Sequence, residues 1–369
     1  MVGAARGAGF LSALTAARER VKLLGIYDPD PVAAQLFLAE HGGERTFPTF
    51  AEAVTAADAV ILASPQHYHA PQAVHALDAG VHVLSEVPAV VSLEQASDLL
   101  AATRRGHAQY MLAENYGYMR SNLIVGAMVR AGLLGQLYSG EAEYLHEMKE
   151  AHRTSDGAPT WRYHWQVGRN GITYPTHSLG PLLEWMDDRI EAVSCVGTGR
   201  WTDSEHEMHD SVTLLGRTRR GGLVRTRLDL LSNRPHLWDY YAVQGTGGAY
   251  EAPRARGDGA KIYLEGRSPR HEWEPLERYA QEFLAPKYAH PPEGSGHGGS
   301  DIWPLLDFLE AIETDTQPPI GVYRALDMTL PGIVSEESIA QGGGWVRVPN
   351  PRTLTAGIGT EPGHEGSLS

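Results

Sequence analysis

Histidine and tyrosine side chains fall in two short stretches that could transfer protons. Tyr174 and His177 lie in Asn-Gly-Ile-Thr-Tyr-Pro-Thr-His-Ser, and Tyr144 and His146 alternate along a segment of strand character, so their side chains point to one face. Because an imidazole exchanges protons near neutral pH, His177 is the best candidate for an acid or base. We predict a catalytic group of these four residues. The alternatives are a helix-capping role for His177 and simple packing for the strand pair.

Four further residues are candidate ligand contacts. Glu114 and Tyr116 follow an expected strand over 109–113, at the carboxyl end where doubly wound sheets bind ligands. Tyr288 and His297 lie in or beside a segment rich in proline and glycine, which could close over a small molecule. We predict that all four contact substrate, although a solvated loop would explain the last two equally well.

A glycine-rich turn opens the chain. Gly3, Arg6 and Gly7 lie in Gly-Ala-Ala-Arg-Gly-Ala-Gly before a helical segment, where backbone N–H groups and the helix dipole could hold a pyrophosphate. The spacing departs from G-x-G-x-x-G, so a helix start built of small residues is the alternative. Asp28 comes roughly twenty residues later, where a carboxylate would accept hydrogen bonds from ribose hydroxyls and repel a 2′-phosphate. We therefore predict NAD as cofactor, unless Asp28 is only a turn residue of Asp-Pro-Asp-Pro.

The surrounding pattern predicts two domains. Short apolar runs alternate with amphipathic helices over 21–83, which is typical of a Rossmann-type doubly wound parallel sheet, and we predict that this domain spans residues 1–120. Residues 121–350 are rich in strands of antiparallel character and predict an α+β domain with an open sheet. The Gly- and Ser-rich tail 353–369 is predicted to be disordered.

The first strand of the Rossmann-type sheet is too short in this sequence. The glycine turn normally follows a buried strand, yet only Met1 and Val2 precede it. We expect this central strand to be missing, which would leave two strand edges unpaired. A natural chain with about six more apolar residues upstream would supply it.

The stretch Ala79–Ala89, Ala-Gly-Val-His-Val-Leu-Ser-Glu-Val-Pro-Ala, resembles the hallmark of the glucose–fructose oxidoreductase, inositol dehydrogenase and MocA (Gfo/Idh/MocA) family. The resemblance implies a Rossmann domain, a nicotinamide cofactor and a substrate domain whose open sheet also forms a homo-oligomer. It also implies which further residues contact the cofactor. These are Ser64, Pro65, His69, Glu86 and Pro88.

Two departures point to a subgroup of that family. Val87 stands where the dehydrogenases carry a catalytic lysine, and Thr173 stands where they carry an aspartate four residues before His177. The altered motifs are similar to those of the NAD-dependent α-N-acetylgalactosaminidases. These motifs are Ser85–Pro88, Glu114–Tyr116, Asn170–Pro181 and Gly296–Asp301. The resemblance implies glycoside cleavage by C3 oxidation, elimination and re-reduction. A sugar or polyol dehydrogenase and a non-catalytic sugar or nucleotide sensor are the alternatives.

Composition excludes several other classes. The formal net charge is -14, and no basic run appears that could bind nucleic acid. No apolar run reaches the roughly 20 residues of a membrane helix, so we expect a cytoplasmic protein. The 17 histidines lack the carboxylate or thiolate pattern of a zinc site, so we predict no metal. The expected partner is a small carbohydrate.

Overall fold

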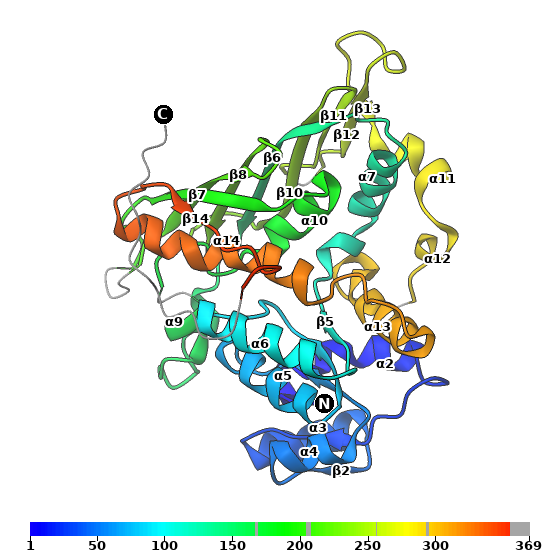
Figure 1. Ribbon diagram of the computed structural model, residues 1–369, viewed down its shortest axis with the longest axis vertical. Helices are drawn as coiled ribbons and strands as arrows, with labels where there is room; N and C mark the ends of the chain where they lie inside the picture. Colours follow the sequence, from blue (N-terminus) through cyan, green and yellow to red (C-terminus); the bar gives the residue numbers. More distant parts are fainter. Residues whose placement is uncertain (167–168, 204–207, 256, 293–294, 355–369) are drawn as a thin grey trace.

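The computed structural model describes residues 1–166, 169–203, 208–255, 257–292 and 295–354. The predicted tail beyond 354 lies outside the described residues. An α/β part built from the N-terminal third lies at one end of the molecule, and a large sheet lies at the other (Figure 1). The predicted fold class, a Rossmann-type domain followed by a mainly antiparallel sheet domain, is confirmed.

Parallel pairing in the N-terminal part runs through β3 (Ala59–Leu62), β4 (His82–Ser85) and β5 (Tyr110–Leu112). Their side chains are buried on both faces, as expected for a parallel sheet between helix layers. The neighbouring helices are α3 (Pro31–His41), α4 (Phe50–Ala56), α5 (His69–Asp78) and α6 (Leu93–Arg105). Side chains cap three of them, because Asp30 accepts from Val32 N, Thr49 from Glu52 N and Ser92 from Gln95 N.

Met1 and Val2 occupy the position of the central strand, between β1 (Gly25–Ile26) and β3. Four backbone hydrogen bonds hold them, from Val2 N to Ile61 O, Ala63 N to Val2 O, Gly3 N to Tyr27 O and Tyr27 N to Met1 O, at 2.8–3.0 Å. The expectation of unpaired edges is therefore wrong at the carboxyl end of the sheet. The pairing is kept there because Met1 and Val2 directly precede the glycine turn, so they are the residues that set its position. The strand expected over 21–27 is shorter in the structure, where β1 spans only Gly25–Ile26.

The second sheet has nine strands in the order β13-β12-β11-β10-β6-β9-β8-β7-β14. Only β6 and β9 pair in parallel. The strands are β6 (Leu137–Leu145), β7 (Ile190–Gly197), β8 (Ser211–Thr218), β9 (Leu223–Asp229), β10 (Leu237–Gly245), β11 (Gly248–Glu251), β12 (Lys261–Leu264), β13 (Glu274–Pro275) and β14 (Val346–Arg347). Helices α10 (Thr176–Met186) and α14 (Val322–Ala340) pack on one face. Alternating burial along β8 leaves the other face open.

The longest helix, α14, was not predicted from the sequence, because Pro331 and Gly332 interrupt its helical pattern. Gly332 is needed there, since a Cβ would lie 2.4 Å from Ile172 O. Ser335 of the same helix accepts a 2.8 Å hydrogen bond from Ile172 N. Thus α14 fixes the segment that leads into α10.

The chain returns to the N-terminal part after the large sheet. Helix α13 (Trp303–Thr314) receives a hydrogen bond from Gln109 at Ala311 O, and Leu112 N donates to Ile320 O. A remaining helix, α7 (Arg120–Arg130), leads from one part into the other. The carboxyl end of β5 and the start of α10 come together, since a side chain that follows β5 contacts one in the first turn of α10.

Candidate active site

A buried histidine and a buried carboxylate form the centre of the site. His177, the second residue of α10, is 7% exposed, and its Nδ1 lies 2.8 and 2.9 Å from the carboxylate oxygens of Glu114. Glu114 is 1% exposed and also accepts from Tyr116 N at 3.0 Å. Because an ionised carboxylate only accepts hydrogen bonds, Nδ1 carries the proton and Nε2 is the atom left to accept one. Glu114 therefore orients His177, whereas the sequence suggested that it contacts a ligand.

Aromatic rings fix the imidazole from several sides. Tyr116 stacks on it with ring centroids 3.9 Å apart, and Tyr174 meets it edge-on at 4.7 Å. Tyr144 lies 5.4 Å away, and the Tyr241 hydroxyl donates to the backbone oxygen of His177. The structure thus brings three of the four predicted catalytic residues into direct ring contact.

The fourth, His146, joins this group through Tyr144. The Tyr144 hydroxyl lies 2.9 Å from His146 Nδ1, just beyond the end of β6. Burial raises the pKa of Tyr144 and Tyr174 and lowers the pKa of His146 to about 4. All three are therefore neutral near pH 7, so Tyr144 donates and His146 accepts.

The glycine turn meets the catalytic group at an ion pair. Arg6 Nε donates to Glu86 Oε1 at 2.6 Å. The Glu86 carboxylate raises the pKa of Arg6, with smaller contributions from Tyr174 and Asp301. Asp301 in turn accepts from His297 Nδ1 at 2.9 Å and holds the pKa of that histidine above its ordinary value.

The geometry of the glycine turn fits a dinucleotide. Gly3 has φ +90°, and a Cβ there would lie 2.5 Å from Ala63 O, so only glycine allows the turn to approach so closely. Asp28 accepts from Ala4 N at 2.8 Å and from Asp30 N at 2.9 Å. Its half-buried carboxylate keeps lone pairs for a ribose diol. Gly7 packs against Met1.

His69, which the family resemblance predicts to contact the cofactor, has both ring nitrogens against backbone oxygens. It is 1% exposed, with Nδ1 2.9 Å from Pro88 O and Nε2 2.7 Å from Ser64 O. The ring therefore ties the Ser64-Pro65 turn to the Glu86–Pro88 segment and presents no nitrogen to a ligand. Val87 is likewise buried, at 4% exposure.

Two predicted substrate contacts, His297 and Tyr288, lie outside the group of rings around His177. The His297 ring is 6.0 Å from that of Tyr116, at the edge of the group. Tyr288, on α12 (Pro286–Ala289), instead contacts the rings of Tyr118 and Trp303.

Sequence reasoning missed one cation of the site. Arg162, on α9 (Trp161–Trp165), acts on the pKa values of Tyr144, Tyr174 and His146, so its charge faces all three. No motif spacing marks it, because it reaches the group from a short separate helix. Asn115 and Asp301, which hydrogen-bond to each other, did lie inside the quoted motifs.

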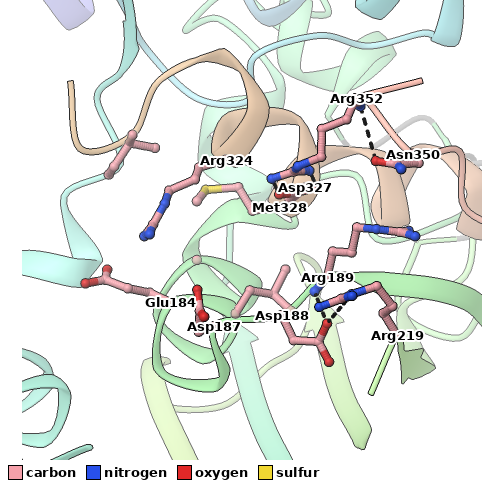
Figure 2. A pocket seen from close by; sticks show the side chains of 13 residues that line it. Glu184, Asp187, Asp188, Arg189, Arg219, Arg324, Asp327, Met328, Asn350 and Arg352 are labelled. Carbon is pink, nitrogen blue, oxygen red and sulfur yellow. Dashed lines mark hydrogen bonds and ion pairs between the residues drawn. The ribbon is translucent and has the colours of Figure 1, made fainter. Parts of the chain in front are cut away.

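A pocket of about 350 Å³ lies elsewhere, between the end of α10 and α14 (Figure 2). Its charged lining is largely paired within itself, because Arg352 binds Asp327 at 2.7 Å and Arg219 approaches Asp188 at 3.6 Å. Its lining residue Gly180 packs close to Glu114, because a Cβ there would lie 3.2 Å from Glu114 Cγ.

Neither a metal-binding cluster nor a membrane-spanning helix occurs among the described residues. No group of three or more His, Cys, Asp or Glu side chains there is arranged to hold a metal ion. No helix in that part of the chain has both the length and the hydropathy to cross a bilayer.

Comparison with known proteins places both halves of the chain. Residues 1–114 match the oxidoreductase family model with an NAD-binding Rossmann fold, and residues 118–354 match the glycosyl hydrolase 109 C-terminal domain. A glycosyl hydrolase family 109 protein of Parabacteroides distasonis is 30% identical over 354 residues, covering 84% of this chain and 74% of the relative. One from Stenotrophomonas maltophilia is 30% identical over 325 residues, covering 77% and 70%.

Among solved structures, a levoglucosan dehydrogenase in complex with NADH and levoglucosan superposes with a TM-score of 0.80 at 19% identity. The superposition covers 94% of this chain and 98% of that one, which shows a shared fold. The family resemblance suggested by the sequence motifs is thereby confirmed. The chain belongs to glycosyl hydrolase family 109, on the scaffold of the Gfo/Idh/MocA oxidoreductases.

Proposed function

We propose that this protein cleaves a glycoside through temporary oxidation of the sugar at C3, with NAD held at the glycine turn. One observation carries the proposal: the Glu114–His177 pair and the Arg6–Glu86 pair converge on Tyr174, so proton transfer and cofactor binding share one site. When bound, NAD accepts a hydride from the sugar carbon and later returns it.

His177 is suited to two proton transfers, one from the C3 hydroxyl group and one to the oxygen of the leaving group. Its Nε2 takes the C3 hydroxyl proton as the carbon is oxidised, and the buried Glu114 carboxylate stabilises the imidazolium that results. His177 then gives that proton to the oxygen of the leaving group. An aspartate at position 173 is not needed, because Glu114 supplies the carboxylate.

Tyr144 and His146 are suited to removing the proton from C2 of the sugar. A C3 ketone makes the neighbouring C2 proton acidic, and its removal expels the leaving group from C1. The Tyr144 hydroxyl is backed by His146 Nδ1 at 2.9 Å, so it can take the C2 proton while giving its own away. Water then adds at C1, and the transfers run in reverse.

A plain sugar dehydrogenase would use the same cofactor site, so the assay must separate the two activities. Aryl glycosides supplied to the NAD-loaded protein are expected to release aglycone with constant absorbance at the nicotinamide wavelength. Steady accumulation of NADH would identify a dehydrogenase instead, and ligand binding without any turnover would identify a sensor.

The His177 assignment predicts a loss of catalysis without a loss of cofactor. His177→Ala should lower turnover on the order of 10²–10⁴-fold, because it removes the acid–base group, and should leave NAD affinity nearly unchanged. Aglycone release and NAD titration measure the two effects. His107→Ala, an exposed histidine at the end of α6, is the matched control. Turnover of the His177 variant close to that of the control would remove His177 from the mechanism.

The Asp28 assignment predicts the choice between the two nicotinamide cofactors. Asp28→Ala should weaken NAD binding and improve tolerance of NADP, because the carboxylate no longer binds the ribose diol or repels a 2′-phosphate. Asp30→Ala, which removes only the exposed cap of α3, should keep the NAD preference. Dissociation constants for both cofactors measure this, and an unchanged NAD/NADP ratio in the Asp28 variant would contradict the assignment.

The open sheet face is the proposed homo-oligomer surface. It carries the exposed side chains Leu215 and Leu223 beside the Arg225–Glu141 pair, a mixture of apolar and paired polar groups typical of an interface. Light scattering should show a mass above that of one chain, and Leu215→Asp should lower it. Val32→Asp, at an exposed apolar position on α3, is the control. A wild-type protein of single-chain mass would overturn this part of the proposal.

A further inference from the structure

A row of polar side chains leads from the site to the surface. Tyr144 is 5% exposed and in ring contact with His177, and its hydroxyl lies 2.9 Å from His146. The half-buried His146 ring is 4.6 Å from the ring of His236, which is exposed. Trp238 contacts both imidazoles, at 4.8 and 4.9 Å, and so holds them together.

These side chains are better suited to transferring a proton than to holding one. Burial raises the pKa of Tyr144, so a phenolate is costly there, but its oxygen can accept a proton as its own moves to His146 Nδ1. Burial also disfavours an imidazolium at His146. The charged and titratable groups that face this ring are His236, Arg162, Glu147 and His177. Only Glu147 among them favours a proton on His146, so the proton moves on.

The proposed reaction needs a second proton acceptor, because the C3 hydroxyl proton and the C2 proton both leave the sugar. In the proposed function His177 already holds the hydroxyl proton when the C2 proton has to leave. The Glu114–His177 pair is enclosed by Tyr116 and Tyr174 and offers no second acceptor nitrogen, because Nδ1 is bound to Glu114. The C2 proton must therefore depart on the Tyr144 side.

We propose that His236 is a proton-relay residue that connects Tyr144 and His146 to solvent, an inference that rests on the proposed function. In the elimination step the C2–H bond breaks, its electron pair forms the C1=C2 bond, and the bond from C1 to the leaving oxygen breaks. The C2 proton goes to Tyr144 Oη, the Tyr144 proton to His146 Nδ1, and the His146 Nε2 proton to His236 and water. The leaving oxygen takes the proton held by His177, so no net oxidation occurs in this step.

The test compares His236→Gln with His107→Gln, since both positions are exposed and glutamine removes only the titratable ring. In dilute buffer, aglycone release by His236→Gln should fall roughly 10–100-fold, at or below the low end of acid–base contributions. Added imidazole should restore it, because a small diffusible base can replace the missing relay. Neither change is expected for His107→Gln.

A second readout does not depend on turnover. Imidazole resonances of the NAD-loaded protein should show the His146 titration midpoint rising in His236→Gln, because the neighbouring His236 ring lowers the pKa of His146 and glutamine does not titrate. Normal turnover of His236→Gln in dilute buffer, or an unmoved His146 midpoint, would overturn the relay alone. Wild-type protein without turnover on any glycoside would overturn the proposed function and the relay together.

Discussion

The buried contact between Glu114 and His177 is the interaction on which the site depends. A carboxylate that is 1% exposed is tolerated only if it is hydrogen-bonded, and here His177 Nδ1 and Tyr116 N satisfy it. The contact with His177 also selects which imidazole nitrogen faces the carboxylate and therefore carries a proton. One constraint therefore sets both local stability and the direction in which His177 can exchange a proton.

Each of the main side chains of the site lies at or near the end of a helix or strand. Glu114 follows β5 of the parallel sheet, His177 lies in the first turn of α10, and Tyr144 comes from the end of β6 in the large sheet. Gly332 of helix α14 packs closely against Ile172, in the segment before α10. The candidate site thus lies where the two parts of the chain meet, and the Arg6–Glu86 pair joins the glycine turn to the Glu86 segment beside it.

Local patterns in the sequence were sufficient to predict the fold class and the family. Alternating apolar runs and helix caps are short-range signals, and so is the motif around Glu86. The tertiary roles were not predictable in this way. Glu114 and His177 are 63 residues apart, so their hydrogen bond has no sequence spacing to reveal it. His236 lies in a loop without a motif, and the glycine and proline in α14 hid a helix that tertiary packing stabilises. The burial of His69 and its two contacts with backbone oxygens were likewise not readable from residue type.

The most direct test of glycoside cleavage through temporary oxidation uses a substrate with deuterium at C3. The proposed mechanism predicts slower turnover with the label retained at C3 of the released sugar, because the same hydride is returned, together with solvent-derived hydrogen at C2. Cleavage at an unchanged rate, with the substrate hydrogens at C2 and C3 untouched, would contradict it.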